Sequence, residues 1–346
     1  MFDRLDSNGD GVVTKDELPA EAQVFFDRLD TDGNGEVTFE EAETLRQNMQ
    51  RMRQRTREMR GDRAPAEGVL DLAYANNDNV RQRLYLALPD SHDASEKIPL
   101  VIYIHGGGWS GGNRDGFARP NSPFALGGKA AVASIGYRLT GEAAWPAQEE
   151  DCVAGVRYLV DHAEEYGLDT SRIALIGPSA GGHLVSYLGT SDALGDIEPA
   201  CVIDIFGVSD LATVAGDLEQ QGQNSSVRRL LSGADDLAAV AKDASPITHV
   251  SADDPPFLIV HGTADVVVPY QQSTTFHEAL QKAGVDSTLI TVEGAGHGPF
   301  GNPKVTKLMQ QFLMNHLLDG TTVIEDATLP DDPGIEESPR GFGGRN

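Results

Sequence analysis

The chain has 346 residues, of which 53 are acidic and 27 are basic, so its formal net charge at pH 7 is −26. That balance argues against binding to nucleic acid, because a phosphate backbone is held by a basic surface. With 40% apolar residues, the chain can bury a large core beside a smaller domain. No apolar run approaches the length that a membrane span needs.

Residues 1–45 contain two twelve-residue segments, 6–17 and 30–41, that follow the pattern of an EF-hand calcium loop. Each has oxygen donors at positions 1, 3, 5, 7, 9 and 12 and a glycine at position 6 for the sharp turn. The predicted ligands of the first loop are Asp6, Asn8, Asp10, Val12, Thr14 and Glu17, with Val12 contributing its backbone carbonyl. The predicted ligands of the second loop are Asp30, Asp32, Asn34, Glu36, Thr38 and Glu41, with Glu36 contributing its backbone carbonyl. We expect two structural Ca²⁺ ions here and no cofactor for catalysis.

The spacing of the two loops is unusual. Their first ligands lie 24 positions apart, so a single helix over 20–29 must serve both loops. This order resembles dockerin-type calcium modules as much as sensor proteins, and it favours a structural or tethering role with a polysaccharide or cell-surface partner. Extracellular calcium modules bind at roughly 10⁻⁴–10⁻³ M, which suits a secreted or periplasmic protein. No signal peptide is visible, and only five residues precede the first predicted ligand, Asp6, so we expect that a leader has been removed or that the chain has been trimmed.

The rest of the chain divides by composition. Residues 46–66 are rich in arginine and predict a helical linker. Residues 67–320 alternate apolar strand patterns with helical patterns, which predicts an α/β fold with a doubly wound, mostly parallel sheet. The segment 210–250 breaks that rhythm and is interpreted as an insertion or lid over the carboxyl ends of the strands. We expect the acidic tail, 321–346, to be poorly ordered.

The individual elements of the α/β zone follow from its apolar runs. The predicted strands are 83–88, 100–105, 131–136, 172–177, 201–206, 256–261 and 287–292. The predicted helices are 147–166, 180–190, 270–284 and 302–318. The two cysteines, Cys152 and Cys201, fall in such patterns and are interpreted as small core residues rather than as a disulfide framework or nucleophiles.

The segment Gly177–Gly181 has the pattern G-x-S-x-G between a predicted strand and a predicted helix. A sharp turn there strains the serine backbone and exposes its hydroxyl. We therefore predict Ser179 as a nucleophile, which needs a histidine to take its proton and an acid to orient that histidine. His297 is the predicted general base and Asp265 the predicted acid, and serine, acid, histidine is the chain order of α/β-hydrolases. Asp210 and Asp254 are the alternative acids.

The glycine run 106–108 follows another predicted strand and lets backbone N–H groups approach a developing oxyanion. With the residue after the nucleophile, it predicts an oxyanion hole made by Gly107, Gly108 and Ala180. His105 and His261 are interpreted as loop-stabilising residues, and His183 as a residue packed one helical turn after the serine. For Trp109, packing beneath the loop and lining an acyl pocket both stay open.

Several segments together carry a family resemblance. They are His105–Trp109, Trp145–Gln148, Gly177–Leu184, Ser245–Pro246, Pro255–Gly262 and Gly296–Gly298. The chain resembles α/β-hydrolase carboxylesterases near the hormone-sensitive-lipase group, and most closely the bacterial feruloyl and acetyl-xylan esterases. The likeness spans about residues 67–318, and it implies esterase activity with Ser179, Asp265 and His297 as the triad. Unlike those lipases, the chain has a calcium module in place of a long helical cap, and the insertion has no counterpart.

These features predict a serine-dependent carboxylic-ester hydrolase for short-chain or small aromatic acyl esters, with feruloyl and acetyl esters of plant polysaccharides as candidates. Its partner would be a small-molecule ester, with no nucleic acid and no membrane span. Three alternatives stay open: a formamidase with the same His-Gly-Gly-x-Trp pattern, a peptidase-like hydrolase of the same fold, and a calcium-dependent binding or scaffold protein with an inactive hydrolase domain.

Overall fold

The computed structural model describes residues 12–14, 17, 34–38, 65–90, 92–214 and 226–331. The chain divides into two compact units, Met1–Asp62 and Arg63–Asn346. In the first unit, strand β1 (Val12–Thr14) pairs antiparallel with β2 (Glu36–Thr38). Val13 lies opposite Val37, and both side chains are buried. This pairing joins the two predicted calcium loops to each other.

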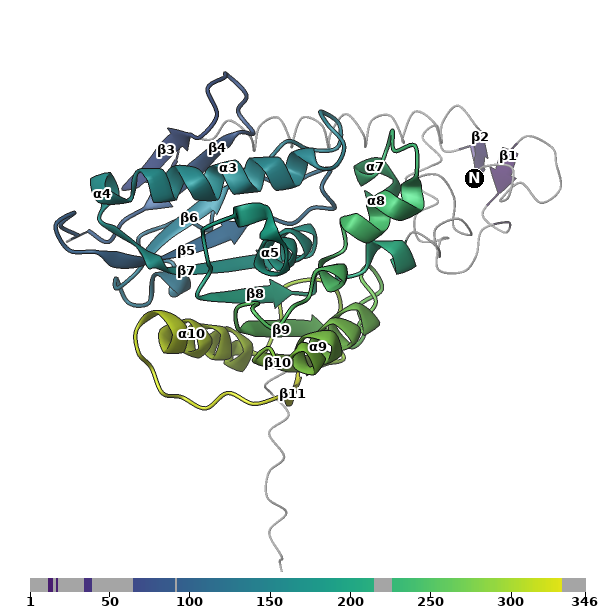
Figure 1. Ribbon diagram of the computed structural model, residues 1–346. Helices are drawn as coiled ribbons and strands as arrows, with labels where there is room; N and C mark the ends of the chain where they lie inside the picture. The colour runs from purple at the N-terminus through teal and green to yellow at the C-terminus, as the bar shows by residue number, and fades with distance from the viewer. Residues whose placement is uncertain are drawn as a thin grey trace, which may run out of the picture. The chain divides into compact units, whose positions relative to one another are not determined.

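A nine-stranded sheet forms the centre of the second unit, in the order β11-β10-β9-β8-β7-β5-β6-β4-β3 (Figure 1). Its strands are β3 (Val69–Ala73), β4 (Arg83–Ala87), β5 (Ile98–Ile104), β6 (Ala131–Ile135), β7 (Leu168–Pro178), β8 (Cys201–Ile205), β9 (Phe257–Gly262), β10 (Ser287–Glu293) and β11 (Ala327–Pro330). β4 is antiparallel to both of its neighbours, β3 and β6, and every other neighbouring pair is parallel. The predicted mostly parallel α/β sheet is confirmed.

Helices pack on both faces of this sheet. The described helices of this unit are α3 (Ala147–Asp161), α4 (Ala163–Tyr166), α5 (Ala180–Thr190), α7 (Ser226–Leu230), α8 (Leu237–Asp243), α9 (Gln271–Ala283) and α10 (Pro303–Leu317), with the short 3₁₀ turns Pro123–Ala125, Asp192–Leu194 and Pro246–Thr248. Alternate residues of β5 show the two layers. Ile102 packs in the cluster with α3, α5 and α9, whereas Val101 packs in the cluster with α10. Both faces of the central strands are therefore buried, which explains their continuous apolar sequences.

Most of the predicted elements occur within a few residues of their expected ends, but three predictions need correction. The helix expected over 147–166 is divided at His162 into α3 and α4. Strands β3 and β11 were not predicted, because neither has a continuous apolar run. The tail expected to be poorly ordered pairs with β10 through residues 327–330, while residues 332–346 lie outside the described part of the chain.

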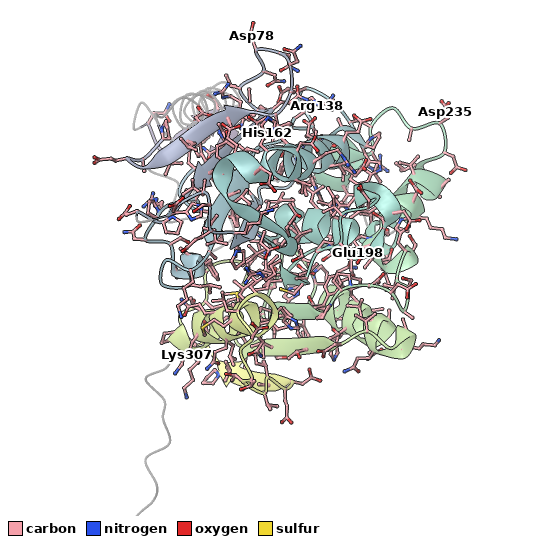
Figure 2. The ribbon with its side chains drawn as sticks, turned by 60° about the vertical axis from the view of Figure 1, so that its left-hand side comes forward. Asp78, Arg138, His162, Glu198, Asp235 and Lys307 are labelled. Carbon is pink, nitrogen blue, oxygen red and sulfur yellow. The ribbon has the colours of Figure 1, made fainter. Side chains whose placement is uncertain are left out.

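The surface and the core divide as the composition suggests. Exposed acidic side chains such as Asp78 and Asp235 project outward from the periphery of the second unit (Figure 2). Cys152 and Cys201 are fully buried and free, which confirms their interpretation as core residues. Burial raises the pKa of both thiols well above the usual value.

Candidate active site

Ser179 occupies the sharp turn between β7 and α5. Its backbone has φ 56° and ψ −120°, a conformation that a residue with a side chain rarely adopts. Its N–H donates to the carbonyl of Ile205 on the neighbouring strand at 2.8 Å, which holds the turn in place. Gly177 and Gly181 lack the space for a Cβ atom, because backbone atoms occupy that position. The glycines of the motif therefore have a steric reason, and the serine stands at the carboxyl edge of the sheet.

The structure brings Ser179, His297 and Asp265 together although they lie in three different loops. Nδ1 of His297 is 2.7 Å from Oδ2 of Asp265, and Nε2 of His297 is 3.0 Å from Oγ of Ser179. A carboxylate only accepts hydrogen bonds, so Nδ1 carries the proton and donates to Asp265. Nε2 is then the acceptor for the serine hydroxyl. This tautomer is the one that a general base next to a serine nucleophile requires.

Asp265 is buried and well supplied with donors. Its Oδ1 accepts from the backbone N–H groups of Val267 at 2.8 Å and Val268 at 2.9 Å. Burial by itself would raise the pKa of Asp265, but the hydrogen bonds from Val268, His297 and Val267 outweigh burial and lower the pKa below its usual value. The carboxylate therefore stays ionised beside His297.

The two alternative acids have other partners. Asp210 accepts from the N–H and the hydroxyl of Thr213, and so begins the helical turn that follows it. Asp254 accepts from the N–H of Ser251 at 3.1 Å and from its hydroxyl at 2.8 Å. Among the described residues, Asp265 is the acid whose carboxylate contacts His297.

The glycine loop after β5 lies beside the serine. A Cβ atom on Gly106 would come within 2.6 Å of the Pro178 carbonyl and 3.4 Å of the Ser179 Cβ. Gly107 and Gly108 have φ of 119° and 58°, so both use the conformational freedom of glycine. Ala180 is the first residue of α5, where N–H groups have no acceptor within the helix. The three predicted oxyanion donors thus lie in the loop and the helix end that flank Ser179.

Two side chains beside the triad have roles that sequence reasoning missed. Phe206 follows β8 with φ 46°, and its ring centroid is 4.6 Å from that of His297. His261 is fully buried at the end of β9, and its Nε2 is 3.2 Å from Oδ2 of Asp265. An aromatic residue directly after a buried strand is the one signal that could have identified Phe206.

Trp109 and His183 are buried beneath the glycine loop. Trp109 is 2% exposed, so of the two open roles the structure supports packing beneath the loop. His183 is fully buried, as predicted, and its Nδ1 is 3.2 Å from Nε1 of Trp109. His105 also packs in the protein, with its Nδ1 2.8 Å from the carbonyl of Gly106.

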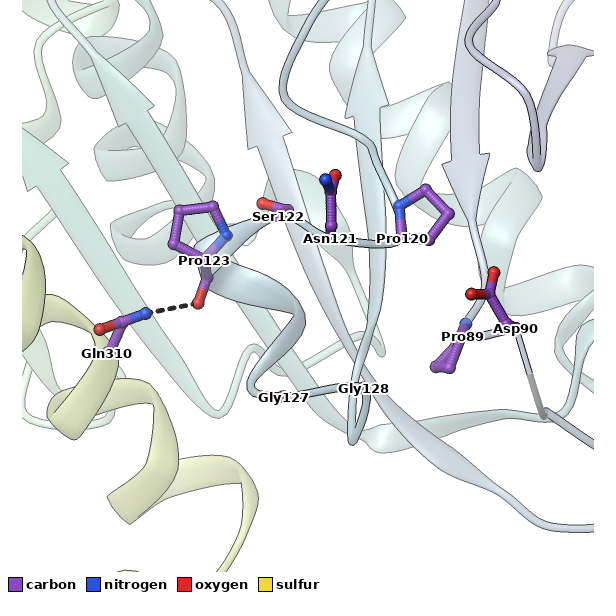
Figure 3. A pocket seen from close by; sticks show the side chains of 9 residues that line it. All are labelled: Pro89, Asp90, Pro120, Asn121, Ser122, Pro123, Gly127, Gly128 and Gln310. Carbon is purple, nitrogen blue, oxygen red and sulfur yellow. Dashed lines mark hydrogen bonds between the residues drawn. The ribbon is translucent and has the colours of Figure 1, made fainter.

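A separate open pocket of about 550 Å³ lies at the opposite edge of the sheet (Figure 3). It is lined by Pro89, Asp90, Pro120, Asn121, Ser122, Pro123, Gly127, Gly128 and Gln310. Pro89 follows β4, and Gly128 precedes the first residues of β6, so the pocket borders the amino ends of the parallel strands. Ser179 lies at their carboxyl ends, and the pocket takes no part in the triad.

The predicted calcium ligands are only partly described. Val12, Thr14, Glu17, Asn34, Glu36 and Thr38 lie in the described residues, whereas Asp6, Asn8, Asp10, Asp30, Asp32 and Glu41 lie outside them. Oε2 of Glu17 accepts from the N–H of Thr14 at 2.9 Å and from its hydroxyl at 3.1 Å. Oδ1 of Asn34 accepts from the N–H of Glu36 at 2.7 Å. These carboxylate, amide and hydroxyl oxygens are the hard donors that Ca²⁺ takes.

Over residues 84–280, more than half of the chain, the sequence matches the family model described as BD-FAE. The chain belongs to the BD-FAE family. Residues 238–324 also match a model described as TAP-like protein, and residues 1–18 and 22–44 match the EF hand model. The BD-FAE match covers Ser179 and Asp265, and the TAP-like match covers His297. The expected resemblance to α/β-hydrolase esterases with an amino-terminal EF-hand module is confirmed.

Curated relatives of this BD-FAE protein are esterases. It is 32% identical over 202 residues to the probable carboxylic ester hydrolase LipM of Mycobacterium tuberculosis, a match that covers 55% of this chain and 46% of the relative. It is 29% identical over 218 residues to esterase LipC of the same organism, covering 59% and 54%. The matches thus span about half the length of these curated relatives.

The matches to two solved structures of similar fold cover a larger share of both chains than these matches to curated relatives do. A truncated carbohydrate esterase from gut microbiota matches with a TM-score of 0.64 and 30% identity, over 73% of this chain and 99% of that one. A thermophilic esterase from Thermogutta terrifontis with bound butyrate matches with a TM-score of 0.61 and 27% identity, over 74% and 97%. The second unit of this BD-FAE protein has the α/β-hydrolase fold. Within the described residues, no helix is long and apolar enough to cross a membrane.

Proposed function

We propose that the chain is a serine carboxylesterase that cleaves short-chain or small aromatic acyl esters through an acyl-enzyme. The observation that carries this proposal is the hydrogen-bonded series from Ser179 through His297 to Asp265, beside a glycine loop that can stabilise an oxyanion. Esterase relatives and esterase structures of similar fold support the reaction class.

In the proposed mechanism each group of the site has one role. His297 takes the hydroxyl proton on Nε2 while Oγ of Ser179 bonds to the ester carbonyl carbon. Asp265 stabilises the imidazolium that results. The carbonyl oxygen becomes an oxyanion, which the N–H groups of Gly107, Gly108 and Ala180 would stabilise. His297 then gives its proton to the departing alcohol oxygen as the acyl–oxygen bond breaks, and the acyl-enzyme forms.

Deacylation repeats these steps with water. His297 takes a proton from the water, the hydroxide oxygen bonds to the acyl carbon, and the proton returns to Oγ of Ser179 as the acid leaves. Phe206 packs against the His297 ring with the ring centroids 4.6 Å apart, and this contact would limit rotation of the imidazole during both half-reactions. The imidazole therefore serves both half-reactions from one position.

The proposed acyl group is small. The Thermogutta terrifontis esterase has been solved with butyrate and with propionate, and the gut microbial relative is named a carbohydrate esterase. Those ligands support acetyl and butyryl groups, and the proposal extends to small aromatic acyl groups, including feruloyl esters of plant polysaccharides, on the family resemblance of the sequence. The alcohol would then be a sugar hydroxyl.

A two-part experiment tests this proposal. A fluorophosphonate probe should label wild-type protein at Ser179 and fail to label Ser179→Ala. Turnover of p-nitrophenyl acetate, butyrate and decanoate, with a feruloyl ester, an acetylated sugar and an N-formyl amide, then defines the acyl class. We expect acetate and butyrate to be cleaved faster than decanoate. Turnover by Ser179→Ala above a few per cent of wild type would overturn the nucleophile, and a preference for decanoate or the formyl amide would overturn the substrate class.

We also propose that residues 1–45 bind two Ca²⁺ ions and tether the enzyme to a polysaccharide or a cell surface. The EF hand match and the oxygen donors of Glu17 and Asn34 support this proposal. When bound, the ions would neutralise part of the acidic excess and contribute folding free energy to the module. A calcium module of this kind fits a secreted or periplasmic location, where calcium is abundant. Calorimetric titration with CaCl₂ tests the stoichiometry, and the absence of binding would overturn it.

A further inference from the structure

His183 joins three separate parts of the chain in the buried layer below the active site. It lies in the first turn of α5, one turn after Ser179, and it is fully buried. Its Nδ1 is 3.2 Å from Nε1 of Trp109, and its Nε2 is 2.8 Å from the carbonyl of Ala244. An indole N–H can only donate and a carbonyl can only accept. The imidazole must therefore accept from Trp109 and donate to Ala244, which leaves one tautomer.

That tautomer is neutral, and it stays neutral over a wide pH range. Burial lowers the pKa of His183 to about 4, and the hydrogen bond to the Ala244 carbonyl opposes this only in part. A protonated ring would carry a donor on both nitrogens and could not accept from Trp109. Both hydrogen bonds therefore persist at the pH where an esterase with a neutral general base works.

On one side of His183 stands the glycine loop. Trp109 directly follows Gly108, has φ 52° and is 2% exposed. Its indole meets the His183 ring edge-on, with centroids 5.2 Å apart and planes at 88°. Its backbone carbonyl accepts from the N–H of Thr140 at 2.8 Å. The carboxyl end of the glycine loop is thus held by two hydrogen bonds of Trp109, one from its indole to His183 and one from the Thr140 N–H to its carbonyl.

On the other side stands the segment 226–250. Ala244 follows α8 directly and is fully buried. The same segment also lies against the glycine loop, because a Cβ atom on Gly108 would lie only 2.8 Å from Oγ of Ser226 and 3.2 Å from its Cβ. The segment therefore contacts the loop directly through Ser226 and is linked to its far end through His183.

We propose that His183 is a positioning residue, which sets the oxyanion loop through the Trp109 indole and couples that loop to residues 226–250. The inference rests on the proposed function, because the proposed function is what makes the N–H groups of Gly107 and Gly108 oxyanion donors. An oxyanion donor must lie within a few tenths of an ångström of its position to stabilise the transition state, and a misplacement of about 1 Å can cost roughly 10²-fold in rate. The hydrogen bond to the buried His183 ring fixes the position of the indole nitrogen, which is a directional constraint that apolar packing does not supply.

The test compares variants that break the two hydrogen bonds separately. Trp109→Phe removes the donor, and His183→Phe removes both bonds. His183→Asn places an amide oxygen near the Nδ1 position, so it keeps an acceptor for Trp109 and loses the donor to Ala244. Thr190→Val is the matched control: Thr190 lies on the same helix and donates to the Ser186 and Pro246 carbonyls at 3.0 and 3.1 Å, away from the glycine loop.

The decisive readout is the inhibition constant of a short-chain trifluoromethyl ketone, which forms a tetrahedral adduct with a serine and depends on the oxyanion donors. In Trp109→Phe and His183→Phe we expect kcat/KM to fall and the inhibition constant to rise by the same factor, roughly 10- to 100-fold, with KM changed less than about threefold. His183→Asn should recover most of the loss. The double variant Trp109→Phe/His183→Phe should be no worse than the poorer single variant, because both single variants already remove the hydrogen bond between Trp109 and His183.

Each contrary outcome points to a different failure. An unchanged inhibition constant in Trp109→Phe and His183→Phe, an equal rise in Thr190→Val, or additive losses in the double variant would each overturn the positioning role. If His183→Phe does not fold, Trp109→Phe and His183→Asn carry the same comparison. If the ketone does not inhibit the wild-type protein, or if Ser179→Ala retains turnover, the proposed function itself fails, and this outcome is separate from the behaviour of His183.

Discussion

Nε2 of His261 lies 3.2 Å from Oδ2 of Asp265, which makes this buried histidine the second imidazole on that carboxylate oxygen. The same Nε2 is 3.0 Å from the carbonyl of Val268, and Nδ1 is 2.7 Å from Oγ of Ser273. With two acceptors at Nε2, that nitrogen carries the proton, so the Ser273 hydroxyl donates to Nδ1. Burial lowers the pKa of His261 more than Asp265 raises it, which keeps the ring neutral.

His261→Phe should lower kcat roughly tenfold, because Asp265 would lose a donor on the oxygen that orients His297. His261→Gln should lose less, since its side-chain amide can still donate near the Nε2 position. Steady-state turnover of p-nitrophenyl acetate measures both, beside thermal unfolding to report stability. Equal activity in the phenylalanine variant and the wild type would show that Asp265 is held adequately by Val267 and Val268.

Asp265→Asn should lower kcat by about 10⁴, because an amide favours the wrong tautomer of His297 while preserving the shape of the site. Asp210→Asn is the comparison, since Asp210 begins the helical turn at 211–214 and has its hydrogen bonds to Thr213. We expect it to change kcat less than twofold. The assignment of the acid would have to move to Asp210 if the second variant proved the more damaging.

Asp204→Asn should stabilise the protein more at pH 8 than at pH 5. Asp204 lies in β8 and is 1% exposed, and burial raises its pKa to about 7 despite a hydrogen bond from the Gly207 N–H. Between about pH 4 and 7 the folded protein holds a proton that the unfolded chain has lost. Stability therefore falls as pH rises through this range, by up to about 1.4 kcal/mol for each pH unit.

Asparagine resembles the protonated acid and has no charge to bury, so it removes this loss. Unfolding temperatures of wild type and variant at pH 5 and pH 8 provide the measurement. The lowered pKa of His183 and His105 gives a slope of opposite sign, with stability lost as pH falls below about 6.5, but this slope is present in both proteins and cancels in the difference. A variant whose gain is the same at the two pH values would refute the buried charge.

Chelation of calcium should increase proteolysis within residues 1–45 and leave turnover at low temperature nearly unchanged. Six of the twelve predicted ligands are carboxylates, which repel one another without the ion, so metal binding is folding free energy for that module. The triad contains no predicted calcium ligand. Limited proteolysis with mass mapping, run in EGTA and in excess CaCl₂, measures cleavage within residues 1–45. Ester turnover under the same two conditions measures the catalytic activity. Near-complete loss of activity in EGTA, restored by calcium, would show that the module shapes the catalytic site.

The sequence predicts most of the site because its signals are local. Ser179, Asp265 and His297 each follow an apolar run, and Ser179 also has Gly177 and Gly181 beside it, where backbone atoms leave no space for a Cβ atom. The contact of Phe206 with His297, in contrast, depends on the order of strands in the sheet, which no single segment reveals. The bond from His261 to Asp265 is local, because the two residues are four positions apart, but the sequence does not distinguish it from a loop-stabilising role of His261.

Pairing with a neighbour also explains the strands that sequence patterns missed. Ala327–Pro330 has no continuous apolar run, and its composition favours a tail; it becomes a strand because β10 presents unpaired backbone groups at the sheet edge. Calcium ligation stays a prediction for all twelve ligands, of which Asp6, Asn8, Asp10, Asp30, Asp32 and Glu41 lie outside the described residues.

Strand β11 has a consequence for the association of the folded protein with other copies of the chain. Asp326 accepts the N–H of Leu289, and the four residues after it cover the open side of β10. β11 is short, alternates partly buried and exposed side chains, and ends at a proline, which cannot donate to a further strand. A chain cut before Ala327 would leave the apolar strand β10 as a bare edge, a template for intermolecular β-pairing. Strand β11 therefore protects the edge of the sheet against intermolecular pairing.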